Sequence, residues 1–197
     1  MGQALNLYAG SLGLAEGAAD SQVRLAAPYI RLASSFLNVG TGNARIDYLG
    51  MHYADRWMDI TSHPLTGGLI LDASQLLEVR GGQGLGNGGQ LTIGGELVVR
   101  PGFDHINLVS GGDLQFGSGT FYTAGDLTLA AAQFYPVTGT SAAIYAGWRG
   151  NNFDYDPERT LTLARTTEVV PDVPYSVFGS LTLGADTINQ GGIVRAP

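Results

Sequence analysis

Two stretches of sequence decide the fold: Leu127-Thr-Leu-Ala-Ala-Ala-Gln-Phe134 and Leu181-Thr-Leu-Gly-Ala-Asp-Thr-Ile188. Each has apolar residues at its first, third and eighth positions and a small residue at its fifth. Successive side chains of a β-strand point to opposite faces, so each leucine pair points one way and the threonine between them the other. We therefore expect an interior position for Leu127, Leu129, Leu181 and Leu183, and an outward one for Thr128 and Thr182.

The same pattern recurs along the chain. Further copies begin at Leu5, Val23 and Leu69, a weaker copy begins at Leu91, and partial copies begin near Ala44, Ile106, Ala142 and Leu161. The starts are about 20 residues apart, a period typical of solenoid proteins. About ten units of this kind predict a stack of coils that share one apolar interior.

The composition also favours an all-β solenoid. The chain has 197 residues, of which 30 are glycine, 44% are hydrophobic and only 14% are charged. Glycine accepts the positive φ angles of repeated tight turns, and no stretch keeps helical apolar spacing without a Gly or Pro interruption. The sequence has no cysteine, so neither a disulfide nor a thiolate metal site is expected. We predict a single unit over 1–197, with side loops at about 47–66 and 147–158.

Charge and hydropathy limit the function classes. The formal charge of −7 and the absence of lysine argue against a nucleic-acid-binding protein. No apolar run reaches the ~18 residues that a membrane-spanning helix needs. We recognise no signal peptide after Met1, and the repeats still continue near Pro197, so we expect a piece of a longer chain.

Residues 125–140 (GDLTLAAAQFYPVTGT) and 179–197 (GSLTLGADTINQGGIVRAP) resemble the filamentous haemagglutinin family. More narrowly, they are similar to the region towards the C-terminal part of large two-partner-secretion exoproteins. The resemblance implies a right-handed parallel β-helix that is exported through a dedicated outer-membrane transporter. It further implies a place on the bacterial cell surface, as an adhesin or as a stalk that presents other modules. It brings no catalytic residues and no cofactor.

Aromatic residues are the main candidates for a binding surface. Tyr48, His52, Tyr53 and Trp57 lie close together in sequence, and Trp148 opens the second expected side loop. Exposed Tyr and Trp side chains would suit a glycan or a protein receptor on a host or neighbouring cell. We favour the other interpretation, in which these aromatic side chains pack over the flank of the coils. No nucleophile motif accompanies His52.

The densest acidic group is Asp154, Asp156 and Glu158. Alternating carboxylates offer the hard oxygen ligands that Ca²⁺ prefers. However, all three residues share one short segment with Pro157, and the neighbouring asparagines favour turns. We therefore interpret this segment as a polar loop and predict no metal site.

A polysaccharide lyase or glycoside hydrolase is the alternative to a structural role, because such enzymes also use β-helices. They need carboxylates, alone or with basic residues, gathered on one outer face of neighbouring coils. Asp104, His105 and Asp113 would line a groove only if the loop at 147–158 folds over them. The acids are otherwise dispersed along the sequence, so we predict a non-catalytic stalk or adhesin segment.

Overall fold

The computed structural model describes residues 4–8, 11–12, 20–33, 66–80, 83–85, 89–93, 96–100, 103–147, 156 and 158–196. All regular secondary structure in these residues is β-strand, which confirms the all-β prediction for this part of the chain. Within the same ranges no helix is able to cross a membrane.

The strands, in chain order, are β1 (Ala4–Tyr8), β2 (Ser11–Leu12), β3 (Gln22–Ala33), β4 (Gly68–Arg80), β5 (Gln83–Leu85), β6 (Gly89–Ile93), β7 (Glu96–Arg100), β8 (His105–Ser110), β9 (Asp113–Phe116), β10 (Gly119–Thr123), β11 (Asp126–Ala131), β12 (Gln133–Pro136), β13 (Ser141–Tyr145), β14 (Thr160–Arg165), β15 (Ser180–Gly184) and β16 (Thr187–Gln190). Most are short, as the period-two alternation of the repeat predicts.

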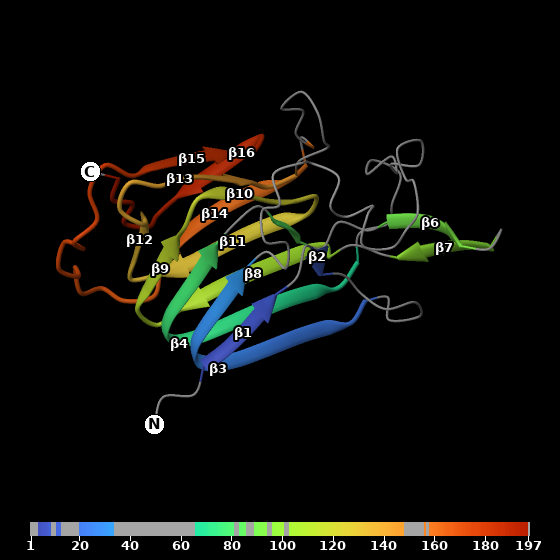
Figure 1. Ribbon diagram of the computed structural model, residues 1–197, viewed down its shortest axis with the longest axis horizontal. Coiled ribbons are helices and arrows are strands. Elements are labelled where there is room, and N and C mark those ends of the chain that lie inside the picture. Colours follow the sequence, from blue (N-terminus) through green and yellow to red (C-terminus); the bar gives the residue numbers. More distant parts are fainter. Residues whose placement is uncertain are drawn as a thin grey trace.

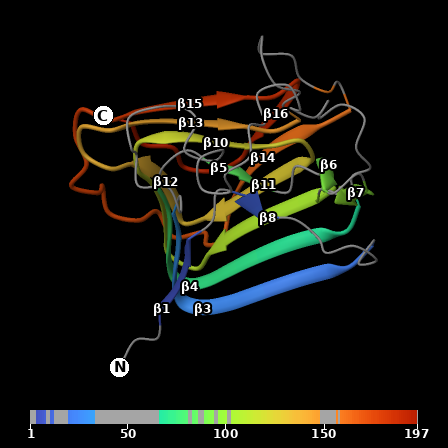
Figure 2. The same ribbon diagram turned by 45° about the vertical axis from the view of Figure 1, so that its right-hand side comes forward.

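Most strands pair in parallel within two sheets, which face each other in Figures 1 and 2. The larger sheet has nine strands, ordered β1-β3-β4-β8-β11-β14-β16, with β9 and β12 alongside. The smaller sheet has five, ordered β15-β13-β10-β5-β2. Strands β6 and β7 form a two-stranded antiparallel sheet of their own.

The larger sheet bends into two arms. Strand β4 pairs with β8 through residues 68–73 and with β9 through residues 76–79, so one strand runs through both arms. Strand β3 does the same, with a register shift between Ala27 and Tyr29. We call the part that contains β8, β11, β14 and β16 the first arm, and the part that contains β1, β9 and β12 the second arm.

The chain repeats one path through these surfaces. It runs along the first arm, turns into the second arm and continues into the smaller sheet, as β8-β9-β10 and then β11-β12-β13. One passage through all three surfaces takes about 20 residues, which explains the repeat period. The copies at Leu127 and Ala142 therefore belong to one passage, in β11 and β13. The expected count of about ten coils is consequently too high, since the copy at Leu91 also lies apart, in the antiparallel β6.

Parallel register places like side chains above one another. In the first arm, one interior column consists of Val23, Leu69, Ile106, Leu127, Leu161 and Ile188. Leu127 and Leu129 are fully buried, whereas Thr128 is half-buried on the outer face, which confirms the predicted orientation of β11. Leu181 and Leu183 of β15 also pack against the core, although they stay half-exposed because β15 is an edge strand.

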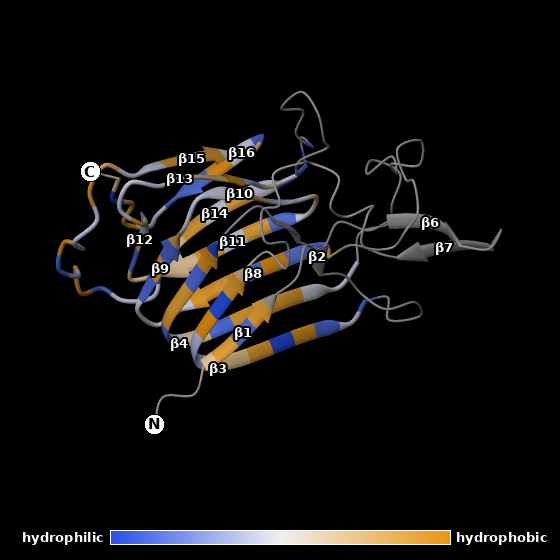
Figure 3. Ribbon diagram, in the orientation of Figure 1, coloured by the Kyte–Doolittle hydropathy of each residue, from blue (hydrophilic) through white to orange (hydrophobic). Residues whose placement is uncertain are grey.

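Aromatic side chains fill the interior where the three surfaces meet. Phe116 and Phe134 of the second arm and Phe121 of the smaller sheet are among the largest fully buried side chains. Figure 3 shows the resulting alternation of apolar and polar residues along individual strands. Burial of this continuous interior is the main favourable contribution to the stability of the stack.

Candidate functional site

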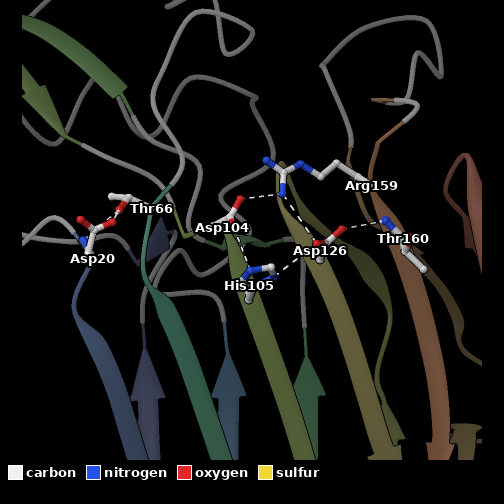
Figure 4. Close-up of polar contacts among 7 residues, drawn as sticks. All are labelled: Asp20, Thr66, Asp104, His105, Asp126, Arg159 and Thr160. Carbon is white, nitrogen blue, oxygen red and sulfur yellow. Dashed lines mark hydrogen bonds and ion pairs between the residues drawn. The ribbon is translucent and has the colours of Figure 1, made fainter.

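Polar side chains gather at one edge of the larger sheet, where the first-arm strands begin (Figure 4). Asp104 immediately precedes β8, and His105 is the first residue of β8. His105 lies in register with Asp126 of β11. Arg159 precedes β14, and Thr160 is its first residue. We call these five residues the polar cluster.

Two carboxylates share two basic groups in the polar cluster. Arg159 Nη1 lies 2.6 Å from Asp104 Oδ1 and 3.7 Å from Asp126 Oδ2. His105 Nε2 lies 2.8 Å from the other Asp104 oxygen, and His105 Nδ1 lies 3.3 Å from Asp126 Oδ2. The Thr160 backbone N–H donates to Asp126 Oδ1 at 2.8 Å. Side chains of three neighbouring strands are thus joined at one edge.

Both ring nitrogens of His105 face carboxylate oxygens. A neutral imidazole donates from only one nitrogen, whereas the imidazolium donates from both. His105 thus bridges the two carboxylates, as Arg159 does. His105 is also the most accessible member of the ion pairs, with 56% of its side chain exposed against 20% for Arg159.

Local backbone geometry allows this close approach. A Cβ atom on Gly125 would collide with the carbonyl oxygens of Phe103 and Asp104. Glycine at position 125 therefore lets β11 begin directly beside the start of β8. The same edge continues through a smaller contact, in which Thr66 and Asp20 bond to each other through Thr66 Oγ1 (Figure 4).

A second outward-facing network lies on the second arm. Glu78 accepts hydrogen bonds from Arg31 at 2.6 Å and from Arg80 at 2.8 Å. Burial acts to raise the pKa of Glu78, but the two arginines outweigh it and hold that pKa below its usual value.

Tyr135 lies on the same arm and is buried. Its hydroxyl donates to Asp113 Oδ2 at 3.0 Å. Burial raises the pKa of Tyr135 to about 12, with further contributions from the charge of Asp113 and from this hydrogen bond. Gln133 Nε2 also donates to Asp113 Oδ2, at 3.2 Å.

The enzyme alternative grouped Asp104, His105 and Asp113 on one flank, and the structure separates them. Asp104 and His105 do lie together, but Asp113 belongs to the second arm and bonds to Tyr135 and Gln133. The statement that the acids are dispersed is wrong for Asp104 and Asp126, because His105 and Arg159 bridge them.

Sequence reasoning overlooked Asp126 and Arg159, although a signal was present. The copies beginning at Ile106, Leu127 and Leu161 stack in register. The residues just before these apolar starts must therefore lie in one row at the sheet edge.

Other candidates fall elsewhere. Outside the described residues lie Tyr48, His52, Tyr53, Trp57, Trp148 and Asp154. Asp156 Oδ1 accepts the backbone N–H of Glu158 at 3.1 Å, and Asp156 N donates to the Gly147 carbonyl at 2.8 Å, as in a polar turn. In the part of the chain that the structure describes, no group of three or more His, Cys, Asp or Glu side chains is arranged to hold a metal ion.

Comparisons with known proteins returned no match: no family model, no curated protein and no solved structure is significantly similar to the chain. The resemblance of residues 125–140 and 179–197 to the filamentous haemagglutinin family therefore stays an expectation.

Proposed function

We propose that the chain is a structural segment of a secreted, filamentous haemagglutinin-like protein of the bacterial cell surface. In this proposal a right-handed parallel β-helix forms a stalk that adheres to other surfaces or presents other modules. Export would proceed through an outer-membrane two-partner-secretion transporter, and the stalk itself would need no cofactor.

The observation that carries the proposal is the continuous parallel register of the first arm of the larger sheet. Six neighbouring first-arm strands keep one apolar column from Val23 to Ile188. Each passage adds one strand spacing of roughly 4.8 Å to the stack, so length grows with each repeat. A continuous interior that each repeat extends suits a mechanical element.

The polar cluster also favours a structural role. Both Asp104 oxygens are engaged, one with Arg159 and the other with His105. Both Asp126 oxygens are engaged as well, with Thr160 and with the two basic groups. Such contacts fasten the starts of three successive passages, and they leave the carboxylates poorly suited to act as free bases.

Surface exposure on cells tests this proposal directly. Antibodies raised against the folded chain should label intact cells of the source organism, and external protease should remove the signal. A cytoplasmic protein of the same cells serves as the control and should be labelled only after permeabilisation. Labelling of the chain only in permeabilised cells would overturn the proposal.

The alternative function is a polysaccharide-degrading enzyme, and one observation favours it. Asp104, His105, Asp126 and Arg159 bring two carboxylates and two basic side chains together where three neighbouring strands begin. In a lyase, the accessible His105 would accept a proton and Arg159 would pair with a uronate carboxylate.

Activity assays separate the two functions. Purified chain should give neither reducing ends nor unsaturated products from uronic-acid and neutral polysaccharides. Turnover that His105→Gln abolishes and Asp186→Asn leaves intact would replace the structural proposal with the enzyme. Asp186 is exposed and lies outside the polar cluster, so it is a suitable control position.

A further inference from the structure

Residues 166–179 leave both sheets between β14 and β15, and we call them the apolar loop. The two preceding passages each place a strand in the second arm, β9 and then β12. The chain after Arg165 forms no such strand, and Val194 of the next passage pairs with Phe134 instead. Figure 1 shows the apolar loop at the left, projecting beyond the sheets.

The backbone of the apolar loop is fixed to the stack at several points. Its carbonyl groups accept hydrogen bonds from side chains and one amide of the neighbouring passages: Arg195 to Pro171 O at 3.2 Å, Gln133 to Asp172 O at 3.1 Å, Thr138 to Tyr175 O at 3.3 Å and Gly139 N to Val177 O at 3.0 Å. Ser176 is buried, and its hydroxyl donates to the Pro136 carbonyl. The polar backbone of the loop thus faces the protein.

The apolar side chains of the loop face solvent instead. Tyr175 is fully exposed, and Phe178 exposes 88% and Val169 72% of their surface. Val170, Val173 and Val177 are also exposed. Apolar residues gathered on a well-anchored surface segment typically mark an interaction site. The apolar loop and the polar cluster are distinct, because the cluster lies where the first-arm strands begin.

Phe178 adds a second, independent indication. Its φ angle is +58°, in the left-handed region that residues other than glycine rarely adopt. The following position accepts only glycine, because a Cβ atom on Gly179 would lie 2.6 Å from Pro136 Cγ. Although the Phe178 backbone is strained, its phenyl ring is not buried against any other part of this chain. Strain of this kind is typical of functional positions.

We propose that the apolar loop docks into an apolar groove, rimmed by Lys or Arg, on a different protein. Glu168 and Asp172 are exposed among the apolar residues, and the whole chain carries a charge of −7, so a basic rim is complementary. Pro171 and Pro174 stiffen the segment with the Pro-x-x-Pro spacing that aromatic-lined grooves recognise.

The exposed aromatic area of the loop is large enough for a protein interface, and its charge favours a basic partner over a second copy of the chain. Tyr175 and Phe178 together offer on the order of 400 Å², about half of the ~800 Å² that each partner buries in a standard interface. A second copy is a poorer partner, because Asp172 lies near the middle of the apolar segment. Two-fold pairing would therefore bring the two Asp172 carboxylates together.

Selection from random peptides displayed on phage, against the immobilised full chain, tests this inference. We expect enriched peptides that combine aromatic or aliphatic residues with Lys or Arg and that bind more weakly as salt increases. The double variant Tyr175→Ser/Phe178→Ser should bind them at least about tenfold more weakly. Tyr29→Ser is the matched control, because Tyr29 is a partly exposed aromatic residue of β3.

Phe178→Gly separates a binding role from a structural one. Glycine relieves the positive φ angle, so the melting temperature should stay unchanged or rise while peptide binding falls. The inference is overturned if no peptide distinguishes the parent from the double variant, or if Tyr29→Ser weakens binding equally. A dimer in sedimentation equilibrium that the double variant abolishes would assign the loop to a second copy. Loop-dependent binding to anionic vesicles would assign it to a membrane.

Discussion

The Leu129 side chain stacks between Leu108 and Leu163 of the neighbouring strands and has no exposed surface. Its neighbour Thr128 is half-buried on the outer face of the same strand. Two adjacent residues of β11 therefore contribute to stability in different ways. Leucine fills a close-packed interior, whereas threonine covers the outside of the sheet.

Truncation of these two side chains should separate the contributions. Leu129→Ala leaves a cavity and should lower the free energy of unfolding by about 2–5 kcal/mol. Thr128→Ala, the matched control, should change it by less than about 0.5 kcal/mol. Urea denaturation monitored by circular dichroism measures both. Equal losses for the two variants would mean that the register of β11 differs from the one described.

Tyr135 gives a prediction about alkaline pH. Its pKa rises from the ordinary 10.0 to about 12 in the folded chain. Below pH 10 the hydroxyl is protonated in both the folded and the unfolded chain. Between the ordinary value and about 12, only the unfolded chain releases the proton, so stability falls as pH rises through this range.

Ultraviolet titration of tyrosinate should therefore show a late ionisation step near pH 12. Tyr135→Phe should remove this step and make the free energy of unfolding less dependent on pH in the alkaline range. Tyr175→Phe is the control, because Tyr175 is fully exposed, and it should keep the late step. A late step that persists in Tyr135→Phe would contradict the assignment.

At the scale of elements, the polar cluster joins the starts of β8, β11 and β14. Arg159 Nη1 and Asp104 Oδ1 are 2.6 Å apart, and both side chains are largely shielded from solvent. One complete passage, β11-β12-β13, lies between the passages that Asp104 and Arg159 precede, so this contact connects the starts of β8 and β14 across β11. Hydrogen bonds between charged, partly buried groups contribute more than exposed ion pairs do.

Removal of this contact should destabilise the edge moderately. Asp104→Asn weakens the bonds to Arg159 and His105, and it should lower the free energy of unfolding by about 1–2 kcal/mol. Asp186→Asn, which lies outside the cluster, should have almost no effect. A double-mutant cycle with Arg159→Gln measures the coupling between the two side chains. Strict additivity of the two single substitutions would refute a direct interaction.

Several elements could be predicted from the sequence because their signal is local. Alternation in Leu127-Thr-Leu gave the inward face of β11, and glycine with interrupted apolar spacing gave the all-β class. The count of coils could not be predicted in this way. The copies at Leu127 and Ala142 look alike because both alternate apolar residues, yet β11 and β13 lie in different sheets. Only long-range pairing distinguishes them.

The polar cluster could not be predicted either, because its residues meet only through long-range pairing of strands. Asp104 and Asp126 are 22 positions apart in the sequence, and nothing local relates them. Stacking of one passage on the next brings them to a common histidine. The exposure of the apolar loop could not be predicted either. Its valine, tyrosine and phenylalanine side chains at 169–178 are of types that are usually buried, yet the structure exposes them.

At the scale of the whole molecule, each strand of the first arm contacts mainly its two neighbours. Strand β11 is paired on both sides, with β8 and with β14. Strand β16 stands at the end of the described order, and its Ile188 is 41% exposed. Gln190 occupies the column that leucines fill in the preceding strands, where Leu163 is its register partner. Stability should therefore decrease towards β16, as expected for a stack held by nearest-neighbour contacts.

Native-state hydrogen exchange measures this gradient directly. Amides of β11 should exchange slowest, at the free energy of global unfolding, and those of β15 and β16 should exchange through smaller openings. Ile188→Ala should then speed exchange in β16 and slightly in β14, whereas Leu129→Ala should speed it throughout the first arm. The two variants remove apolar side chains from neighbouring interior columns, so each serves as the control for the other. Equal protection from β8 to β16, lowered equally by both substitutions, would instead identify a single all-or-none unit. Such a unit would unfold in one step, whereas a stack held by nearest-neighbour contacts would open passage by passage.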